Sequence, residues 1–359
     1  MHTVAILGAG KIGRMVAHFL GRSGDYSLRI GDVSREEATT LAGRLGDAAT
    51  GHEVDFGRPA TLEPVLAGAD AVVSCCPFDC NPFIAEQAVK YDLHYLDLTE
   101  DIETTRKVLA FEKQSNKALI PQCGLAPGFI TITAMHLIKR MEEVESLKMR
   151  VGALPRFPSN MLKYNLTWST EGLINEYANP CEAIRDGKHV MVEPLQGLEE
   201  LVVDGVRYEA FNTSGGLGSL TQTMEGKVSN LNYKSIRYPG HNQFMRLLMN
   251  ELRMNRHRDT LKEIFERALP QTFQDQVVIY VSAIGKWQGD FVEHTYARTV
   301  HHQNIYGENW SAIQITTASG ICGVLDLLLE GKLPQKGFVR QEDVDYEAFA
   351  NNQFGKYYA

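Results

Sequence analysis

The residues with the clearest chemical potential stand at the N-terminus. Residues 8–13 read G-A-G-K-I-G and directly follow an apolar, β-branched run at residues 3–7. Gly8 would permit a tight turn off that strand, and Gly10 would let a ligand approach the backbone. Gly13 would allow the following helix to pack closely on the strand. This order of residue types predicts a backbone cradle for a pyrophosphate group.

The expected helix supplies the rest of this anion site. Its free N–H groups, including those of Lys11 and Ile12, carry the partial positive charge of a helix N-terminus. Asp32 ends the next expected strand, about 20 residues beyond the last glycine, where a carboxylate can accept ribose hydroxyls. The order of strand, glycine loop, helix, strand and acid is the dinucleotide-binding fingerprint. The alternative, a glycine-rich turn that binds no nucleotide, leaves Asp32 unexplained.

The charge of Asp32 also bears on which dinucleotide is bound. A carboxylate at this position would repel a 2′-phosphate, so we predict NAD as the cofactor. NADP stays possible because Arg35 follows three residues later and could contact that phosphate. Arg35 could equally be a solvated residue at the start of the next helix.

Alternating strands and helices must position this loop. Apolar strand-like runs alternate with helical patterns of about ten residues, which indicates βαβ units and a parallel sheet. The further expected strands are residues 51–56, 69–74, 93–98 and 118–121, and the helices are residues 36–45, 61–67, 82–90 and 102–114. The fold class is therefore α/β, with an N-terminal, doubly wound Rossmann-type sheet.

Ligands of such sheets lie beyond the carboxyl ends of the strands. Cys75, Cys76 and Pro77 follow the fourth expected strand and should pass near the nicotinamide half of the cofactor. A nucleophilic cysteine is the alternative, but no histidine stands nearby in sequence to activate one. Asp97 and Glu100 stand at the end of the fifth strand, where either could hold or deprotonate an amine. Asp97 could instead cap the following helix.

The pattern changes after residue 128. Shorter strands, turns and few long helices over residues 129–310 predict a second, α+β domain for substrate binding and oligomerisation. Residues 204–205 (D-G) and 287–289 (W-Q-G) should be hairpin turns. Residues 311–329 are helical and apolar, and we expect them to return to the first domain. That domain would then comprise residues 1–128 completed by about 311–359, with a surface-bound tail after Gly331.

Composition limits the function classes. The 359 residues are 44% hydrophobic and 22% charged, with a net charge of −8, which gives no electrostatic support for nucleic-acid binding. We see no room for a signal peptide and no apolar run of membrane-spanning length, so we expect a cytoplasmic protein without a membrane partner. The six cysteines form no paired C-x-x-C elements, so we expect free thiols and no metal site. Apolar strands in the second domain suggest a homodimer or homotetramer.

The chain resembles the saccharopine dehydrogenase-like family, and within it the L-lysine 6-dehydrogenases. The resemblance runs from residue 4 to about residue 255, and its second-domain motifs are more specific than the glycine loop. The matching stretches are residues 8–13, 124–128 (G-L-A-P-G), 152–155 (G-A-L-P), 164–169 (Y-N-L-T-W-S), 173–177 (L-I-N-E-Y), 209–211 (E-A-F) and 237–241 (R-Y-P-G-H). Saccharopine-processing reductases tend to carry aspartate where this chain has Ala126, which favours a smaller substrate such as free lysine.

The resemblance implies NAD-dependent oxidation of the ε-amine of L-lysine, a small-molecule substrate. Saccharopine dehydrogenase and a carboxynorspermidine-type reductase are the enzyme alternatives, and a nucleotide-sensing binding protein is the non-enzyme alternative. His241 could act as base or proton shuttle, or be a structural histidine. Arg237 could pair with a substrate carboxylate, or form an internal ion pair. Tyr164 and Thr213 are expected as walls of the substrate pocket.

Overall fold

The structure, a computed structural model, describes residues 1–358 and divides into two compact units. The first unit comprises residues 1–132 together with the C-terminal segment from residue 316, and the second comprises residues 133–315. The chain therefore leaves the first unit once and returns to it.

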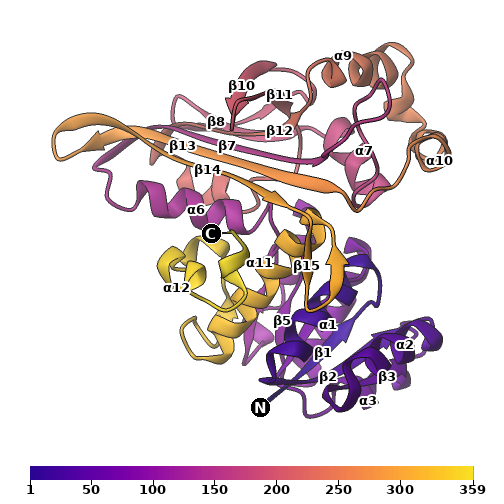
Figure 1. Ribbon diagram of the computed structural model, residues 1–359. Helices are drawn as coiled ribbons and strands as arrows, with labels where there is room; N and C mark the ends of the chain where they lie inside the picture. Colours follow the sequence, from indigo (N-terminus) through magenta and orange to yellow (C-terminus); the bar gives the residue numbers. More distant parts are fainter. Residues whose placement is uncertain (359) are drawn as a thin grey trace. The chain divides into compact units, whose positions relative to one another are not determined.

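A seven-stranded parallel sheet forms the first unit (Figure 1). Its order, β3-β2-β1-β4-β5-β6-β17, reverses at β1, as in doubly wound dinucleotide-binding folds. The α/β prediction is thus confirmed. The strands are β1 (His2–Leu7), β2 (Tyr26–Asp32), β3 (Ala49–Glu53), β4 (Ala71–Ser74), β5 (His94–Leu96), β6 (Ala118–Ile120) and β17 (Gly337–Phe338).

Helices join these strands as the sequence pattern predicts. In α1 the apolar face is buried, with Met15, Val16, Phe19 and Leu20 each at most 1% exposed. The helices of this part of the chain are α1 (Lys11–Ser23), α2 (Arg35–Leu45), α3 (Glu63–Leu66), α4 (Asn81–Lys90), α5 (Ile102–Leu109) and α6 (Phe129–Ile138).

The C-terminal tail belongs to the core of the first unit, so the prediction of a surface-bound tail is wrong. Strand β17 extends the parallel sheet beside β6, and helix α12 (Tyr346–Ala350) buries Phe349 completely. The ring of Tyr358 stacks on Phe129, with centroids 3.6 Å apart. Periodicity could not reveal this, because the tail is built from short elements joined by turns.

Helix α11 (Ala312–Leu329) is 18 residues long and apolar enough to cross a membrane, so the prediction that no run reaches that length is wrong for this segment. The helix is 83% buried inside the protein, which is typical of a core helix. Gly320 explains part of the burial, because a Cβ there would meet the Gly124 carbonyl oxygen at 2.5 Å. The small residue thus lets the helix approach the turn after β6.

A mixed eight-stranded sheet forms the second unit, with the order β10-β11-β12-β7-β13-β14 and the hairpin β8–β9 beside β12. Only β12 and β7 pair in parallel. The strands are β7 (Glu143–Pro155), β8 (Cys181–Arg185), β9 (Lys188–Val192), β10 (Glu199–Val203), β11 (Val206–Asn212), β12 (Val228–Arg237), β13 (Asp275–Trp287) and β14 (Asp290–His301). A small separate sheet pairs β15 (Gln303–Ile305) with β16 (Glu308–Trp310).

The sequence prediction for this sheet was incomplete. Strands β8 and β12 were missed. Both predicted hairpins are present, and their turn residues have positive φ, as at Asp204 and Gly205. The apolar residues of β12 stand at positions 228, 231, 233 and 236, so strict alternation is interrupted and the strand signal is weak, although the strand lies in the middle of the sheet.

Helices at one end of this sheet build the second hydrophobic core (Figure 1). They are α7 (Thr170–Ala178), α9 (His241–Arg246), continued by a π-helical turn at Leu247–Glu251, and α10 (Arg258–Ala268), with the short α8 (Leu220–Met224) nearer β8. Tyr177, Phe211 and Met245 are among the buried members of that core. This core surrounds the polar side chains described next.

Candidate functional site

The glycine loop of the first unit has the geometry of an anion cradle. Gly8 has a φ of +101°, and its α-carbon faces the Cys75 carbonyl so closely that a Cβ would lie 2.8 Å from the oxygen. A Cβ on Gly13 would overlap the Gly8 carbonyl. In contrast, a Cβ on Gly10 would have no neighbour within 4 Å. Gly8 and Gly13 are therefore required for backbone packing, whereas the space beside Gly10 is not filled by other residues.

That open space lies at the start of α1. The helix has no side-chain cap at Gly10 and no acidic residue in its first turn, so nothing on the helix competes with a bound anion. Lys11 and Ile12 are the first two residues of the helix, so their N–H groups belong to its N-terminus. The residues present therefore fit the pyrophosphate of a dinucleotide.

Asp32 ends β2 and organises the same loop. Its carboxylate accepts the Ala9 N–H at 2.7 Å through Oδ2 and the Ser34 N–H at 2.8 Å through Oδ1. Each carboxylate oxygen can accept a further bond, so Asp32 can still receive a ribose hydroxyl. Asp32 therefore lies against the glycine loop, as the fingerprint requires.

The turn after β4 adjoins the loop through the contact between Cys75 and Gly8. Cys75 and Cys76 are half-buried, and Pro77 is exposed. Burial raises the pKa of the Cys76 thiol to about 12 and that of Cys75 still further. Neither thiol is therefore ionised near neutral pH, which removes support for a nucleophilic cysteine.

Asp97 occupies the end of β5 but is completely buried. Its Oδ2 accepts the Tyr95 hydroxyl at 2.7 Å, and its Oδ1 accepts the backbone N–H groups of Thr99 at 2.9 Å and Gln122 at 3.0 Å. Burial raises the pKa of this carboxyl group. These bonds tie the turn after β5 to the turn after β6, which is a structural task, and the predicted catalytic role gains no support from them.

The helix cap considered for Asp97 is supplied by another residue. Asp101 caps α5 by accepting the Thr104 N–H at 2.7 Å. Glu100 is half-buried in the same turn and stays a predicted catalytic residue. Of the two carboxylates suggested by the sequence, Glu100 is therefore the one with solvent-accessible surface.

The turn after β6 closes on itself, with Gly124 and Gly128 forming an isolated bridge. The Gln341 side chain donates to the Pro121 carbonyl at 3.0 Å and contacts the Cys123 thiol at 3.2 Å. With Gly320 against Gly124, the C-terminal part of the chain thus fixes this turn. Ala126 is half-buried in it.

The second unit brings Arg237, Tyr164 and His241 together around Tyr177. Arg237 is 3% exposed, and its Nε donates to the Tyr177 hydroxyl at 2.7 Å. The guanidinium also lies over the Tyr164 and Tyr177 rings, 5.3 and 5.6 Å from their centroids. Its Nη2 pairs with Glu176 at 3.4 Å. The arginine is thus held in one orientation by an ion pair and two aromatic faces.

His241 begins α9 and is 2% exposed. Its Nδ1 lies 2.8 Å from the Leu162 carbonyl, and its Nε2 lies 3.0 Å from the Tyr177 hydroxyl. Burial, followed by the charge of Arg237, lowers the pKa of His241 to about 3. The ring is therefore neutral near pH 7 with both nitrogens engaged, which favours the structural interpretation over the proton shuttle.

Thr213 joins the same network through a second route. Its Oγ1 lies 2.8 Å from the Ser235 hydroxyl, which lies 3.5 Å from the Glu176 carboxylate. Glu176, Tyr177 and Ser235 also belong to this cluster, although the sequence did not single them out as site residues. Glu176 and Tyr177 could have been found, because they are the last two residues of the L-I-N-E-Y stretch that carries the family resemblance. Ser235 could be found only once β12 was recognised as a strand, because Ser235 and Arg237 then share a face.

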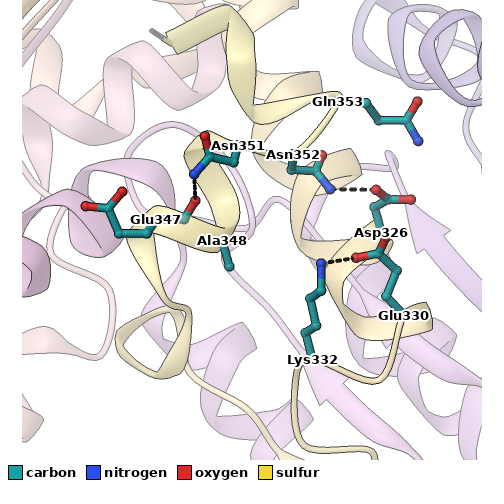
Figure 2. Close-up of a pocket in the computed structure, with 8 residues that line it drawn as sticks. All are labelled: Asp326, Glu330, Lys332, Glu347, Ala348, Asn351, Asn352 and Gln353. Carbon is teal, nitrogen blue, oxygen red and sulfur yellow. Dashed lines mark hydrogen bonds and ion pairs between the residues drawn. The ribbon is translucent and has the colours of Figure 1, made fainter.

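A depression of about 380 Å³ opens elsewhere in the first unit (Figure 2). It is lined by α11, the turn after it, α12 and the turn after that, and Lys332 there pairs with Glu330 at 2.7 Å. None of the predicted site residues lines it. Among the described residues, no group of three or more histidine, cysteine, aspartate or glutamate side chains is arranged to hold a metal ion.

Fold and glycine cradle together define a dinucleotide-binding α/β protein. Residues 4–123 match the saccharopine dehydrogenase NADP binding domain, and residues 124–354 match the saccharopine dehydrogenase C-terminal domain. The chain belongs to the saccharopine dehydrogenase family. The match runs well beyond residue 260, where the resemblance seen in the sequence faded. A nicotinamide dinucleotide is the cofactor of the first unit, as the glycine loop predicted.

Two proteins with similar sequences are the following relatives. The chain is 23% identical over 195 residues to the mitochondrial alpha-aminoadipic semialdehyde synthase of Mus musculus, covering 53% of this chain and 21% of that protein. It is 24% identical over 194 residues to the NADP(+), L-glutamate-forming saccharopine dehydrogenase of Saccharomyces cerevisiae, covering 52% of this chain and 42% of that protein. These alignments thus span less than half of either relative.

Two solved structures share the fold. The apo saccharopine dehydrogenase (L-Glu forming) from Saccharomyces cerevisiae matches with a TM-score of 0.81 and 16% identity, covering 97% of this chain and 96% of that one. The homospermidine synthase from Legionella pneumophila, in complex with NAD, matches with a TM-score of 0.72 and 14% identity, covering 99% and 89%. At these identities the likeness concerns the fold alone.

Proposed function

We propose that the protein is an NAD-dependent amino-acid dehydrogenase that oxidises the ε-amine of L-lysine. The product would be the 6-semialdehyde, which cyclises to piperideine-6-carboxylate. The observation that carries the reaction class is the open cradle at Gly10 with Asp32 beside it, in a chain of the saccharopine dehydrogenase family. Arg237 and its aromatic neighbours in the second unit support an amino-acid substrate, because a buried guanidinium suits a carboxylate.

The chemistry requires the chain to manage one proton and one hydride. The ε-ammonium must first lose a proton, since the developing iminium needs the nitrogen lone pair. The C–H bond then breaks with its electron pair, which the nicotinamide accepts when it is bound. Water hydrolyses the imine to the aldehyde and ammonia, and the aldehyde condenses with the α-amine. The share of the protein is to orient the substrate and receive the proton.

Glu100 is the residue that we propose as the proton acceptor. The Asp97 carboxylate already accepts three hydrogen bonds, and His241 is neutral with both ring nitrogens hydrogen-bonded. Glu100 follows the same strand end as Asp97 and keeps accessible surface. Replacing Glu100 by Gln should lower kcat by about a hundredfold or more while NAD binding persists.

Asp32 supports NAD rather than NADP in this chain. Its carboxylate is fixed against the glycine loop, where it would repel a 2′-phosphate. The matching family domain is described as NADP binding. A preference of this chain for NAD would therefore come from its own residues, Asp32 in particular. Comparing kcat/KM with the two cofactors tests it directly.

Saccharopine oxidation is the second candidate, favoured by the names of the relatives. Ala126 argues for lysine, because the chain lacks an aspartate that would engage a larger substrate. The deciding experiment is an amine screen of lysine, ornithine, saccharopine and carboxynorspermidine, each with NAD and with NADP, at alkaline pH. NAD reduction with lysine is the expected result. Turnover with saccharopine alone would overturn the choice of lysine.

The cytoplasmic location and the homo-oligomeric state stay predictions.

A further inference from the structure

A closed ring of hydrogen bonds joins the glycine loop of the first unit to the start of α2. The Ala9 N–H donates to Asp32 at 2.7 Å, and the Ala9 carbonyl accepts the Arg14 Nε at 3.1 Å. The Arg14 Nη2 in turn pairs with Glu37. The Glu37 N–H donates to the Ser34 hydroxyl at 3.3 Å, and the Ser34 N–H donates back to Asp32 at 2.8 Å. This hydrogen-bond ring therefore places two carboxylates and one guanidinium beside the loop.

The hydrogen-bond ring lies where the adenosine ribose of a dinucleotide would bind. Asp32 is the acid at the end of β2 that can accept ribose hydroxyls in this fold. The adjoining loop is open, because a Cβ on Gly10 would meet no atom within 4 Å. Val33 follows Asp32 and is 75% exposed, so the chain does not cover the ring from that side. A phosphate on the 2′-hydroxyl would thus stand next to the charged members of the ring.

Arg14 is the only cation of the ring, and its charge is already balanced. A phosphate monoester carries about 1.5 to 2 negative charges near pH 7, and a guanidinium binds it well through paired N–H donors. Glu37 pairs with that guanidinium, so the ring as a whole has two carboxylates against one cation. NADP would bring its phosphate to a place of net negative charge, whereas NAD brings an uncharged hydroxyl.

Removing the Glu37 carboxylate would change this balance without disturbing the fold. The ion pair is exposed, with 42% of the Arg14 side chain and 50% of the Glu37 side chain accessible, and such pairs add little to stability. The bond from the Arg14 Nε to the Ala9 carbonyl would remain and keep the guanidinium at the glycine loop. The Arg14 Nη2 would then be able to donate to a phosphate oxygen.

Arg35 is the other cation near Asp32, and the structure distinguishes it from Arg14. It is the first residue of α2, and its exposed side chain has no hydrogen bond or ion pair among residues 1–358. Nothing therefore holds Arg35 against the glycine loop. Because no carboxylate pairs with Arg35, its availability to a phosphate is the same with and without Glu37.

We propose that Glu37 determines which nicotinamide dinucleotide this chain accepts, by withholding the Arg14 guanidinium from a 2′-phosphate. With Glu37 present, the cation of the ring is paired and the site favours NAD. Without Glu37, Arg14 pairs with the phosphate and NADP binds. Glu37 is a positioning residue, because it acts through Arg14. The inference rests on the proposed function for the preference for NAD, and it adds a second determinant beside Asp32.

Fluorescence titration of the full chain with NADH and NADPH tests the proposal without any amine substrate. The measured quantity is the ratio of the Kd for NADPH to the Kd for NADH. Glu37→Gln should lower this ratio about tenfold or more, because one repulsive charge is lost and one charge-assisted bond to the phosphate is gained. An unchanged ratio would overturn the proposal.

Glu36→Gln is the matched control. Glu36 is the neighbour of Glu37 in the first turn of α2, is equally exposed to solvent by class, and makes no bond through its carboxylate among residues 1–358. Both substitutions remove one negative charge from the same helix turn, so thermal unfolding of the two variants should be similar. Glu36→Gln should leave the ratio within about twofold. Equal shifts in the two variants would show a general charge effect and overturn the proposal.

A double variant tests whether Arg14 is the residue that Glu37 controls. Arg14→Gln combined with Glu37→Gln should lose the gain in NADPH binding that Glu37→Gln produces alone. That gain should also shrink between about 0.05 M and 0.5 M salt, because it comes from exposed charges. A gain that persists in the double variant would assign the phosphate to another cation, such as Arg35, and overturn the proposal.

The outcomes also distinguish this inference from the proposed function. A parent protein that binds NADPH more tightly than NADH would refute the proposed preference for NAD. Glu37→Gln should even then lower the ratio further, while Glu36→Gln does not. A parent protein that prefers NADH, with the same ratio in Glu37→Gln, would refute the role of Glu37 and leave the preference to Asp32.

Discussion

Replacing Asp97 by Asn separates a structural carboxylate from a catalytic one. The carboxylate accepts three hydrogen bonds, from the Tyr95 hydroxyl and the N–H groups of Thr99 and Gln122. An asparagine oxygen at the Oδ1 position would keep both backbone bonds. Its amide would face the Tyr95 hydroxyl, which could turn toward the Asn81 carbonyl, 3.4 Å away.

The structure sets the size of the expected effects. Asp97→Asn weakens two charge-assisted bonds, from the backbone, and loses the third, from Tyr95, but it removes a buried charge whose raised pKa reflects the cost of desolvation. We therefore expect a loss of about 1 kcal/mol in the free energy of unfolding. Asp97→Ala leaves three buried donors without an acceptor, which costs on the order of 1–3 kcal/mol each. Even with relaxation, Asp97→Ala should lose about 4 kcal/mol and fold poorly.

Urea denaturation gives the stability of each variant, and NAD reduction by lysine gives kcat. If Asp97 is structural, Asp97→Asn keeps kcat within about threefold, since loss of a general base typically costs at least a hundredfold. A variant as stable as the parent protein, yet slowed a hundredfold with unchanged KM, would refute this reasoning and restore Asp97 as the base.

Three further changes test other parts of the structure. Gly10→Val should fold normally and lose NADH binding, whereas Gly13→Ala, whose Cβ would overlap a carbonyl, should be clearly less stable; fluorescence titration and denaturation measure both. Asp32→Ser should raise kcat/KM with NADP relative to NAD by about tenfold or more, because a repulsive charge is lost. Burial raises the pKa of Asp275 from 3.8 to about 6, so the folded state binds its proton more tightly. Its contribution to stability is present below about pH 3.8 and is lost as pH rises through 6, so about 3 kcal/mol should disappear from the difference between the parent protein and Asp275→Asn.

The first unit was largely predictable because its signals are local. A β-branched run, three glycines and an acid fix the strand, loop, helix and second strand, and the parallel order follows from alternating elements. The tail was mispredicted for the opposite reason. Strand β17 has two residues, and its place beside β6 depends on a pairing more than 200 residues away in sequence. No periodic pattern records such a contact.

The second unit shows that residue types alone do not predict which hydrogen bonds a side chain makes. The sequence singled out Arg237, Tyr164 and His241, and the structure places them in one cluster. Their hydrogen bonds, however, depend on Tyr177 and Glu176, which come from α7, and on β12, which the sequence pattern did not predict as a strand. The role of a titratable side chain depends on which of its bonds are already used, and that is a property of tertiary packing.

Asp97 and Glu176 illustrate this difference between two buried carboxylates. Asp97 has no exposed surface and accepts three donors that belong to the turns around it, so ionising it organises the backbone. Glu176 keeps 14% of its side chain exposed and pairs with the buried guanidinium of Arg237 at 3.4 Å, so its charge fixes a side chain and not a turn. Both residues are acids that stand within two positions of a tyrosine in the sequence, and only the packing around them separates these two tasks.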